Sequence, residues 1–173
     1  MMSGVVGGPF SIRPAGAEDL TFLADMLVEA VNWHPRREWD RERVLSSPEL
    51  ARYVSGWPRD GDLGVIAEAA GVPIGAAWLR LLPASDPGYG FVAPDVPEMT
   101  IGVVAPWRGR GVGRALVRAV AGQARAAGVA RASLSVERGN RARALYQDEG
   151  FRVVSSDANS DTMLLDLPSS GAP

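Results

Sequence analysis

Glycines and arginines crowd the segment 103–114, which reads VVAPWRGRGVGR and joins a short β-branched run to a helical repeat. The glycines fall where the predicted helix begins. Backbone N–H groups there have no partner inside the helix, and the helix dipole adds partial positive charge. A strand, loop and helix of this kind can direct several N–H groups at one phosphate. The segment therefore predicts a site for a phosphorylated ligand.

Three phosphate-binding patterns can be compared at this loop. A nucleotide-triphosphate loop needs Lys and then Ser or Thr after its last glycine, where this chain has Arg114 and Ala115. A dinucleotide fingerprint needs a third glycine where Arg114 stands, and it follows the first strand of a βαβ unit. The third pattern is Arg or Gln, two residues, Gly, one residue, and Gly or Ala. Arg108, Gly111 and Gly113 meet it. A glycine-rich turn before an ordinary helix is the remaining alternative.

This third pattern resembles the acyl-CoA pyrophosphate loop of the GNAT family of N-acetyltransferases. A second block of that family has an asparagine, a tyrosine and a Gly-Phe pair in that order, and residues 140–151 resemble it through Asn140, Tyr146, Gly150 and Phe151. The resemblance is strong over residues 98–165 and only architectural before them. On these two blocks the chain is identified as a member of the GNAT family.

The family resemblance implies an α/β fold of the acyl-CoA N-acyltransferase type. Its central sheet is mixed and mostly antiparallel, with six to seven strands flanked by about four helices. We expect a disordered N-terminus over 1–9, one acetyltransferase domain over 10–167, and a flexible tail over 168–173.

Hydrophobic periodicity predicts the elements that must position the site. We expect a first strand and an amphipathic helix, then a broken helical region over 40–55, and then a hairpin of strands 63–69 and 74–82 with a tight turn over 71–73. The later elements follow the order strand, loop, helix, strand, helix, strand, strand. The segment 83–97 is long and rich in glycine and proline, so it is either a lid or binding loop or a floppy surface insertion.

Composition excludes several function classes. The 173 residues carry a net charge of −2, so there is no electrostatic case for binding nucleic acid. The absence of cysteine excludes a thiol nucleophile, and a single histidine, His34, argues against a metal site. No apolar stretch is long enough for a membrane span. We expect a cytoplasmic protein with no nucleic acid, membrane or metal partner.

The resemblance implies acetyl-CoA as the cofactor, held by its pyrophosphate on loop amides. The corresponding residues here are Arg108, Gly109, Arg110, Gly111, Val112, Gly113 and Arg114. In the family a bulge splays the preceding strand from its neighbour, so the amide of Val103 or Val104 would polarise the thioester carbonyl. Asn140 matches a cofactor-contacting position, and it is also a good helix cap.

Glu98 is the candidate general base and Tyr146 the candidate general acid. By strand alternation Glu98 shares a face with Thr100 and Gly102. Only Trp107 separates the loop proline from its arginine, where the family usually has two residues, and a one-residue slip would turn Glu98 to the other face. A surface or strand-end carboxylate is its alternative role. A phenol with a pKa of about 10 can protonate the departing thiolate, although Tyr146 also suits an apolar core.

The acceptor site in this family lies between the first two helices and the loop that corresponds to 83–97. Trp33, His34 and Tyr89 are the candidates there, since aromatic side chains can form a wall for an amine, although such residues more often cover a core. We expect an N-acetyltransferase that transfers acetyl to a primary amine of a small molecule or peptide by direct attack in a ternary complex. A non-catalytic acyl-CoA-binding or sensing module and a nucleotide-dependent dehydrogenase are the alternatives. Family members often form homodimers.

Overall fold

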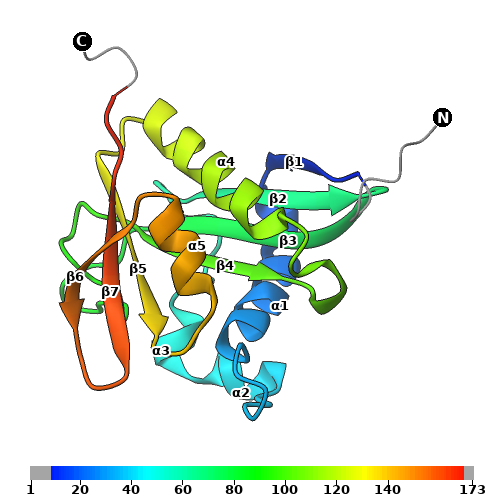
Figure 1. Ribbon diagram of the computed structural model, residues 1–173, viewed down its shortest axis with the longest axis horizontal. Coiled ribbons are helices and arrows are strands. Elements are labelled where there is room, and N and C mark those ends of the chain that lie inside the picture. Colours follow the sequence, from blue (N-terminus) through cyan, green and yellow to red (C-terminus); the bar gives the residue numbers. More distant parts are fainter. Residues whose placement is uncertain (1–8, 170–173) are drawn as a thin grey trace.

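The computed structural model describes residues 9–169, which build one seven-stranded sheet in the order β1-β2-β3-β4-β5-β7-β6 (Figure 1). The expected terminal segments 1–9 and 168–173 lie outside the described residues, apart from Pro9, Pro168 and Ser169. The strands are β1 (Ser11–Pro14), β2 (Leu63–Ala69), β3 (Val72–Arg80), β4 (Glu98–Val103), β5 (Arg131–Glu137), β6 (Arg152–Ser156) and β7 (Ser160–Asp166). The helices are α1 (Leu20–Val31), α2 (Arg41–Ser46), α3 (Pro48–Ala51), α4 (Val112–Ala126) and α5 (Ala142–Asp148).

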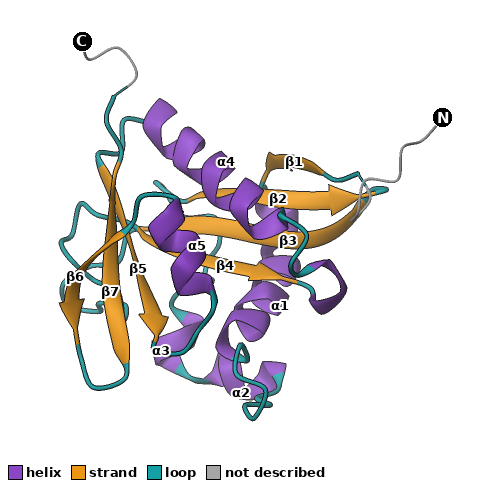
Figure 2. Ribbon diagram, in the orientation of Figure 1, coloured by secondary structure: helices purple, strands orange, loops and turns teal. Residues whose placement is uncertain are grey.

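The sheet is mixed and mostly antiparallel, which confirms the expected fold class. All neighbouring strands are antiparallel except β4 and β5, which are parallel and pair only at Glu98 and Ser133. Beyond that pair the two strands run apart, as Figure 2 shows. The divergence leaves an opening in the middle of an otherwise continuous sheet.

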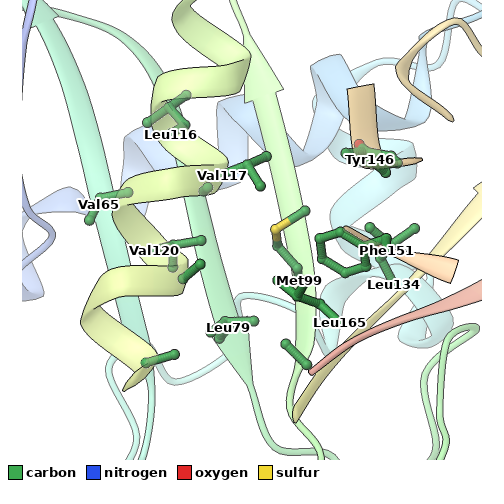
Figure 3. Close-up of a cluster of buried hydrophobic side chains, with 14 of the residues drawn as sticks. Val65, Leu79, Met99, Leu116, Val117, Val120, Leu134, Tyr146, Phe151 and Leu165 are labelled. Atoms are coloured by element: carbon green, nitrogen blue, oxygen red, sulfur yellow. The ribbon is translucent and has the colours of Figure 1, made fainter. Parts of the chain in front are cut away.

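Helices cover both faces of the sheet. On one face α4 buries a stripe at helical spacing against β2, β3 and β4, and Figure 3 shows Leu116, Val117 and Val120 in this cluster. On the other face α1 packs on β3 and β4. The approach of α1 is close at Gly102, where an added Cβ would lie 2.5 Å from the carbonyl oxygen of Met26. Within the described part of the chain, no helix has the length and hydropathy needed to cross a bilayer.

The hairpin of β2 and β3 turns two residues earlier than the sequence predicts. Ala70 and Gly71 form the turn with φ values of 51° and 77°, and β3 already starts at Val72. Positive φ at both central residues suits the twist of a two-residue hairpin. The predicted start of this strand at residue 74 is therefore wrong. Pro73 is accommodated inside β3 beside a register shift in β2.

A buried ion pair fastens the segment after α3 to the sheet. Arg80 at the end of β3 is 1% exposed, and its guanidinium donates to both carboxylate oxygens of Asp62 at 3.1 and 2.7 Å. It also donates to the carbonyl oxygens of Arg52 and Ser55 at 2.9 and 2.7 Å. These four bonds fix the backbone that carries Tyr53.

Replacing Asp62 with Ala should lower the free energy of unfolding by about 3–5 kcal/mol, because it leaves the Arg80 charge buried without its counterion. Urea denaturation measures the loss. Asp60→Ala is the matched control, since Asp60 is an exposed carboxylate two residues away, and it should change stability by less than about 0.5 kcal/mol. Equal effects of the two substitutions would contradict this account.

Candidate active site

The divergence of β4 from β5 frees backbone donors on one edge of β4. The Val104 N–H donates to the carbonyl oxygen of Ile74 on β3 at 2.9 Å. Donors alternate along a strand, so the N–H groups of Ile101 and Val103 face the gap instead. Val103 keeps the expected free amide, whereas the Val104 alternative is wrong because its N–H is already bonded. The expected bulge is also absent from the β3–β4 pairing, which runs without a register shift.

The gap opens into a cleft of about 2040 Å³. Its walls come from β4, β5, the end of α1, the start of α4 and α5. Most of the predicted site residues line it: Trp33, His34, Tyr89, Glu98, Val103, Arg108, Gly109, Gly111, Gly113, Arg114, Asn140 and Tyr146. The side chains of Val104, Arg110 and Val112 do not, and that of Val112 is buried in the core below α4.

The loop before α4 presents a run of backbone donors. Within the described chain no hydrogen bond occupies the N–H groups from Gly109 to Arg114. Gly109 and Gly111 have φ values of 72° and 86°, which L side chains rarely adopt, and Gly111 is the residue that caps α4. Successive N–H groups in such a conformation form a concave anion site at the positive end of the helix. The loop thus fits a diphosphate.

The three arginines of the loop already have protein partners. Arg108 donates to the Val103 carbonyl oxygen at 2.9 Å and forms an ion pair with Glu29 of α1. Arg114 forms ion pairs with Glu149 at 2.6 Å and Asp148 at 3.2 Å. The Arg110 guanidinium lies 5.3 Å from the centre of the Trp107 ring. Their contact with a phosphate stays a prediction, and exposed ion pairs of this kind contribute little that a ligand would have to overcome.

Glu98 is buried beside the cleft on the face that strand alternation predicts. Its side chain is 2% exposed, so the alternative of a surface carboxylate is wrong, although it is the first residue of β4. Oε1 accepts hydrogen bonds from the N–H of Gly90 at 2.8 Å and from the Tyr53 hydroxyl at 3.1 Å, whereas Oε2 has no partner among residues 9–169. Burial raises the pKa of Glu98, and the two donors oppose that rise.

Tyr146 belongs to both the core and the cleft. Its ring lies edge-on to Phe151 with 5.9 Å between centroids, at the margin of the cluster in Figure 3. Burial raises the pKa of its phenol, which therefore stays protonated at neutral pH. No hydrogen bond within residues 9–169 occupies the hydroxyl. The core and cleft alternatives of the sequence are thus compatible.

Asn140 lies two residues before α5, next to the N-cap residue Arg141, and its side chain bonds to the first residue of the helix. Its Oδ1 accepts a hydrogen bond from the N–H of Ala142 at 3.0 Å, at the start of the helix that carries Tyr146. Because Asn140 also lines the cleft, its capping role leaves a contact with a cofactor open.

Three of the predicted aromatic residues also line the cleft. Trp33 and His34 lie edge to face, 5.3 Å apart, and His34 Nδ1 accepts from the N–H of Arg36 at 3.1 Å. Tyr89 is 60% exposed. The three candidates for the acceptor wall therefore line one cleft with Glu98.

The loop between β3 and β4 is held down rather than loose. The N–H of Tyr89 donates to the Tyr53 hydroxyl at 2.8 Å, the N–H of Gly90 to Glu98, and Ser133 Oγ to the Gly90 carbonyl oxygen at 2.7 Å. The alternative of a floppy insertion is wrong. Sequence reasoning gave Tyr53 no role of its own, because no local pattern marks a hydroxyl whose partners lie 36 and 45 residues away.

Sequence reasoning also missed an ion pair that joins two walls of the cleft. Arg37, in the connection after α1, donates to both carboxylate oxygens of Glu137 at the end of β5, at 2.8 and 2.9 Å. The pair holds the pKa of Glu137 below its usual range. The two residues are 100 positions apart, so no sequence spacing could have indicated the contact.

The model of the Acetyltransferase (GNAT) family matches residues 25–151. The chain belongs to the GNAT family. This match covers β4, the glycine loop and the end of α5, the elements that build the cleft.

Relatives and solved structures agree with this family. Mycothiol acetyltransferase of Corynebacterium glutamicum is 29% identical over 131 residues, which are 74% of this chain but only 39% of that protein. The GNAT domain of S. lividans PAT matches with a TM-score of 0.69 at 22% identity, over 94% of this chain and 93% of that one. YncA of Salmonella typhimurium, a putative acetyltransferase solved with its cofactor acetyl-CoA, matches with a TM-score of 0.63 at 23% identity, over 95% and 97%.

Replacing Gly111 with Glu should abolish CoA binding, with at least about a hundredfold loss of affinity in calorimetry. The substitution strains a backbone at φ 86° and places a carboxylate where the amides converge. Gly122→Glu is the matched control, because Gly122 is an exposed residue on the same helix with open space around it. An affinity for CoA that survives Gly111→Glu in the folded variant would remove the loop from the site.

Proposed function

We propose that this GNAT protein is an acetyl-CoA-dependent N-acetyltransferase that acts on a primary amine by direct attack in a ternary complex. One observation carries the proposal: the unoccupied N–H groups from Gly109 to Arg114 open into the cleft where β4 leaves β5. A diphosphate and a thioester can occupy these two places on one ligand. Acetyl-CoA is the cosubstrate of this family and has both groups.

Main-chain groups would hold the cosubstrate. The amides of the glycine loop are suited to the diphosphate, with Asn140 at the neighbouring wall. The N–H of Val103 faces the gap and can donate to the thioester carbonyl oxygen. A donor fixed there stabilises the negative charge that develops on this oxygen when the amine attacks.

Two side chains would move the protons. The acceptor ammonium loses a proton to Glu98, directly or through a water molecule, and the free amine attacks the acetyl carbon. The carbon–sulfur bond then breaks, and the Tyr146 hydroxyl gives its proton to the departing thiolate. The second proton of the attacking nitrogen is released as the amide forms and restores the Tyr146 hydroxyl, directly or through water. The raised pKa of Glu98 makes its carboxylate a stronger base, and the raised pKa of Tyr146 keeps its proton on the phenol until the thiolate departs.

The acceptor is proposed to be a small molecule or a peptide with a primary amine, bound against Trp33, His34 and Tyr89. The name of the mycothiol acetyltransferase relative supports acetyl transfer, although the chain spans only 39% of that protein. Direct attack is favoured because the chain has no cysteine to carry the acetyl group. A non-catalytic acyl-CoA sensor on the same fold is the second candidate, since the loop site alone would suffice for it.

A screen of mixed primary amines with acetyl-CoA tests the proposal, with released CoA thiol as the readout. The chain itself contains no cysteine, so it adds no background to a thiol assay. We expect thiol release that depends on an added amine. Tight CoA binding with no turnover across small amines and peptide N-termini would instead support the sensor.

Replacing Tyr146 with Phe should lower kcat by about ten- to a hundredfold and change the Kd for CoA much less, because only a proton donor is lost. Steady-state kinetics and calorimetry separate the two effects. Tyr89→Phe removes a hydroxyl from an exposed ring of the proposed acceptor wall, so its effect should appear in the KM for the amine and not in kcat. An unaltered kcat in Tyr146→Phe would make Tyr146 a core residue only.

A further inference from the structure

Tyr53 joins the buried carboxylate to the loop above it. The residue follows α3 and is buried in the hydrophobic cluster below α1. Its hydroxyl donates to Glu98 Oε1 at 3.1 Å and accepts from the N–H of Tyr89 at 2.8 Å. Its own carbonyl oxygen accepts from Trp78 Nε1 at 2.9 Å, so the backbone beneath the ring is fixed to β3.

The two oxygens of Glu98 have different surroundings as a result. Oε1 takes two donors, Tyr53 and the N–H of Gly90, whereas Oε2 is buried and takes none. Gly88 lies directly against Oε2, since an added Cβ there would come within 2.2 Å of it. The missing side chain of Gly88 leaves the space that this oxygen occupies, and no group among residues 9–169 bonds to it.

The charges around Glu98 are otherwise neutralised. From β3, Arg80 is paired with Asp62, and Arg52 next to Tyr53 pairs with Asp86 of the loop at 3.1 Å. Arg52 also donates to the Pro87 carbonyl oxygen, and its charge favours the ionised form of Glu98.

The other elements packed around the carboxylate contribute polar groups without a charge. From β5, Ser133 offers a hydroxyl that is bonded to the Gly90 carbonyl oxygen. From the loop, the N–H of Gly90 donates to Oε1, and the nearby backbone of Gly88 also lowers the pKa of the carboxylate. Among the described residues, Tyr53 is therefore the side chain that bonds directly to the carboxylate.

We propose that Tyr53 is a positioning residue for Glu98, which fixes Oε1 and the β3–β4 loop and so orients the carboxylate that takes the proton of the acceptor amine, directly or through a water molecule. This inference rests on the proposed function. It adds a residue that acts through the base and sets the pH at which the base is ionised. Arg52 bonds to Asp86 and Tyr53 bonds to Tyr89, so both residues hold the loop between β3 and β4. The contacts that orient the base therefore also fix this loop.

The direction of the pH effect follows from the hydrogen bond. A donor to a carboxylate favours its ionised form, so the loss of the Tyr53 hydroxyl raises the pKa of Glu98 further. The base is then protonated up to a higher pH. Activity should fall most at the acid end of the profile and recover as the pH rises.

The first test is the pH profile of kcat/KM for Tyr53→Phe against the wild-type protein, with the same amine, so that the titration of the amine cancels in the ratio. We expect a loss on the order of tenfold at the acid end and less than about twofold on the alkaline plateau. Ser133→Ala is the matched control, because it frees the Gly90 carbonyl oxygen but keeps both donors to Glu98. Its acid limb should stay where it is. An equal loss at every pH in Tyr53→Phe would overturn the inference.

A second measurement needs no acceptor. Carbon-13 NMR of labelled glutamate carboxyls, with the Glu98 signal assigned by its absence in Glu98→Gln, follows the base in the free protein. We expect its midpoint to move to higher pH in Tyr53→Phe. An unmoved midpoint would overturn the role of Tyr53 and leave the proposed acetyl transfer intact. A midpoint that moves while the rate profile does not would overturn Glu98 as the base, and with it the catalytic part of this inference.

Discussion

A strand inside a sheet can form backbone hydrogen bonds along both of its edges. Strand β4 does so along the edge facing β3, but pairs with β5 at a single position. Its even-numbered residues bond to β3, while the odd-numbered ones face a neighbour that pairs with it at a single position. Buried N–H groups without partners are costly, so a sheet that opens in this way is expected to hold a ligand in the opening. The glycine loop lies where β4 continues into α4, so the free strand edge and the free helix donors line the same cleft.

Two buried ionisable groups stand opposite each other in the β3–β4 ladder, and their surroundings differ in an informative way. Arg80 and Glu98 are register partners. Four hydrogen bonds satisfy Arg80, which thereby holds the backbone under Tyr53. Glu98 is only half satisfied, because one of its oxygens has no partner. A fully bonded buried charge is part of the scaffold, whereas a half-bonded one retains the capacity for proton transfer.

Local patterns predicted the elements and the glycine loop well, because each depends on neighbours within a few positions. The stripe of α4, the positive φ of Gly111, the cap at Asn140 and the alternation that turns Glu98 inward are all of this kind. The predicted start of β3 was wrong because the hairpin turn includes Ala70 at positive φ. An alanine gives no sequence signal for that backbone conformation. The Val104 amide was wrongly predicted to be free. The pairing of β4 with β3 decides which alternate N–H groups are bonded, and that of Val104 donates to Ile74.

The contacts that define the site most closely had no sequence signal. Tyr53 reaches Glu98 across 45 positions and Arg37 reaches Glu137 across 100. Such pairings arise from the packing of whole elements, so they become visible only when the sheet and both helical layers are in place. The contacts of the loop 83–97 over Glu98 also had no sequence signal. Its composition fits a mobile segment as well as one held by hydrogen bonds.

The ion pairs of the arginines in the glycine loop affect how an anionic ligand is attracted to this protein. Arg108 is neutralised by α1 and Arg114 by residues at the end of α5, so internal carboxylates occupy the places that an anion from outside would take. An anion that bonds to Arg108 or Arg114 would therefore replace Glu29 or Glu149, whereas the N–H groups of the glycine loop need no such exchange. Substitution changes the net field less than addition does, so the attraction at long range is weak and recognition is left to short-range donors.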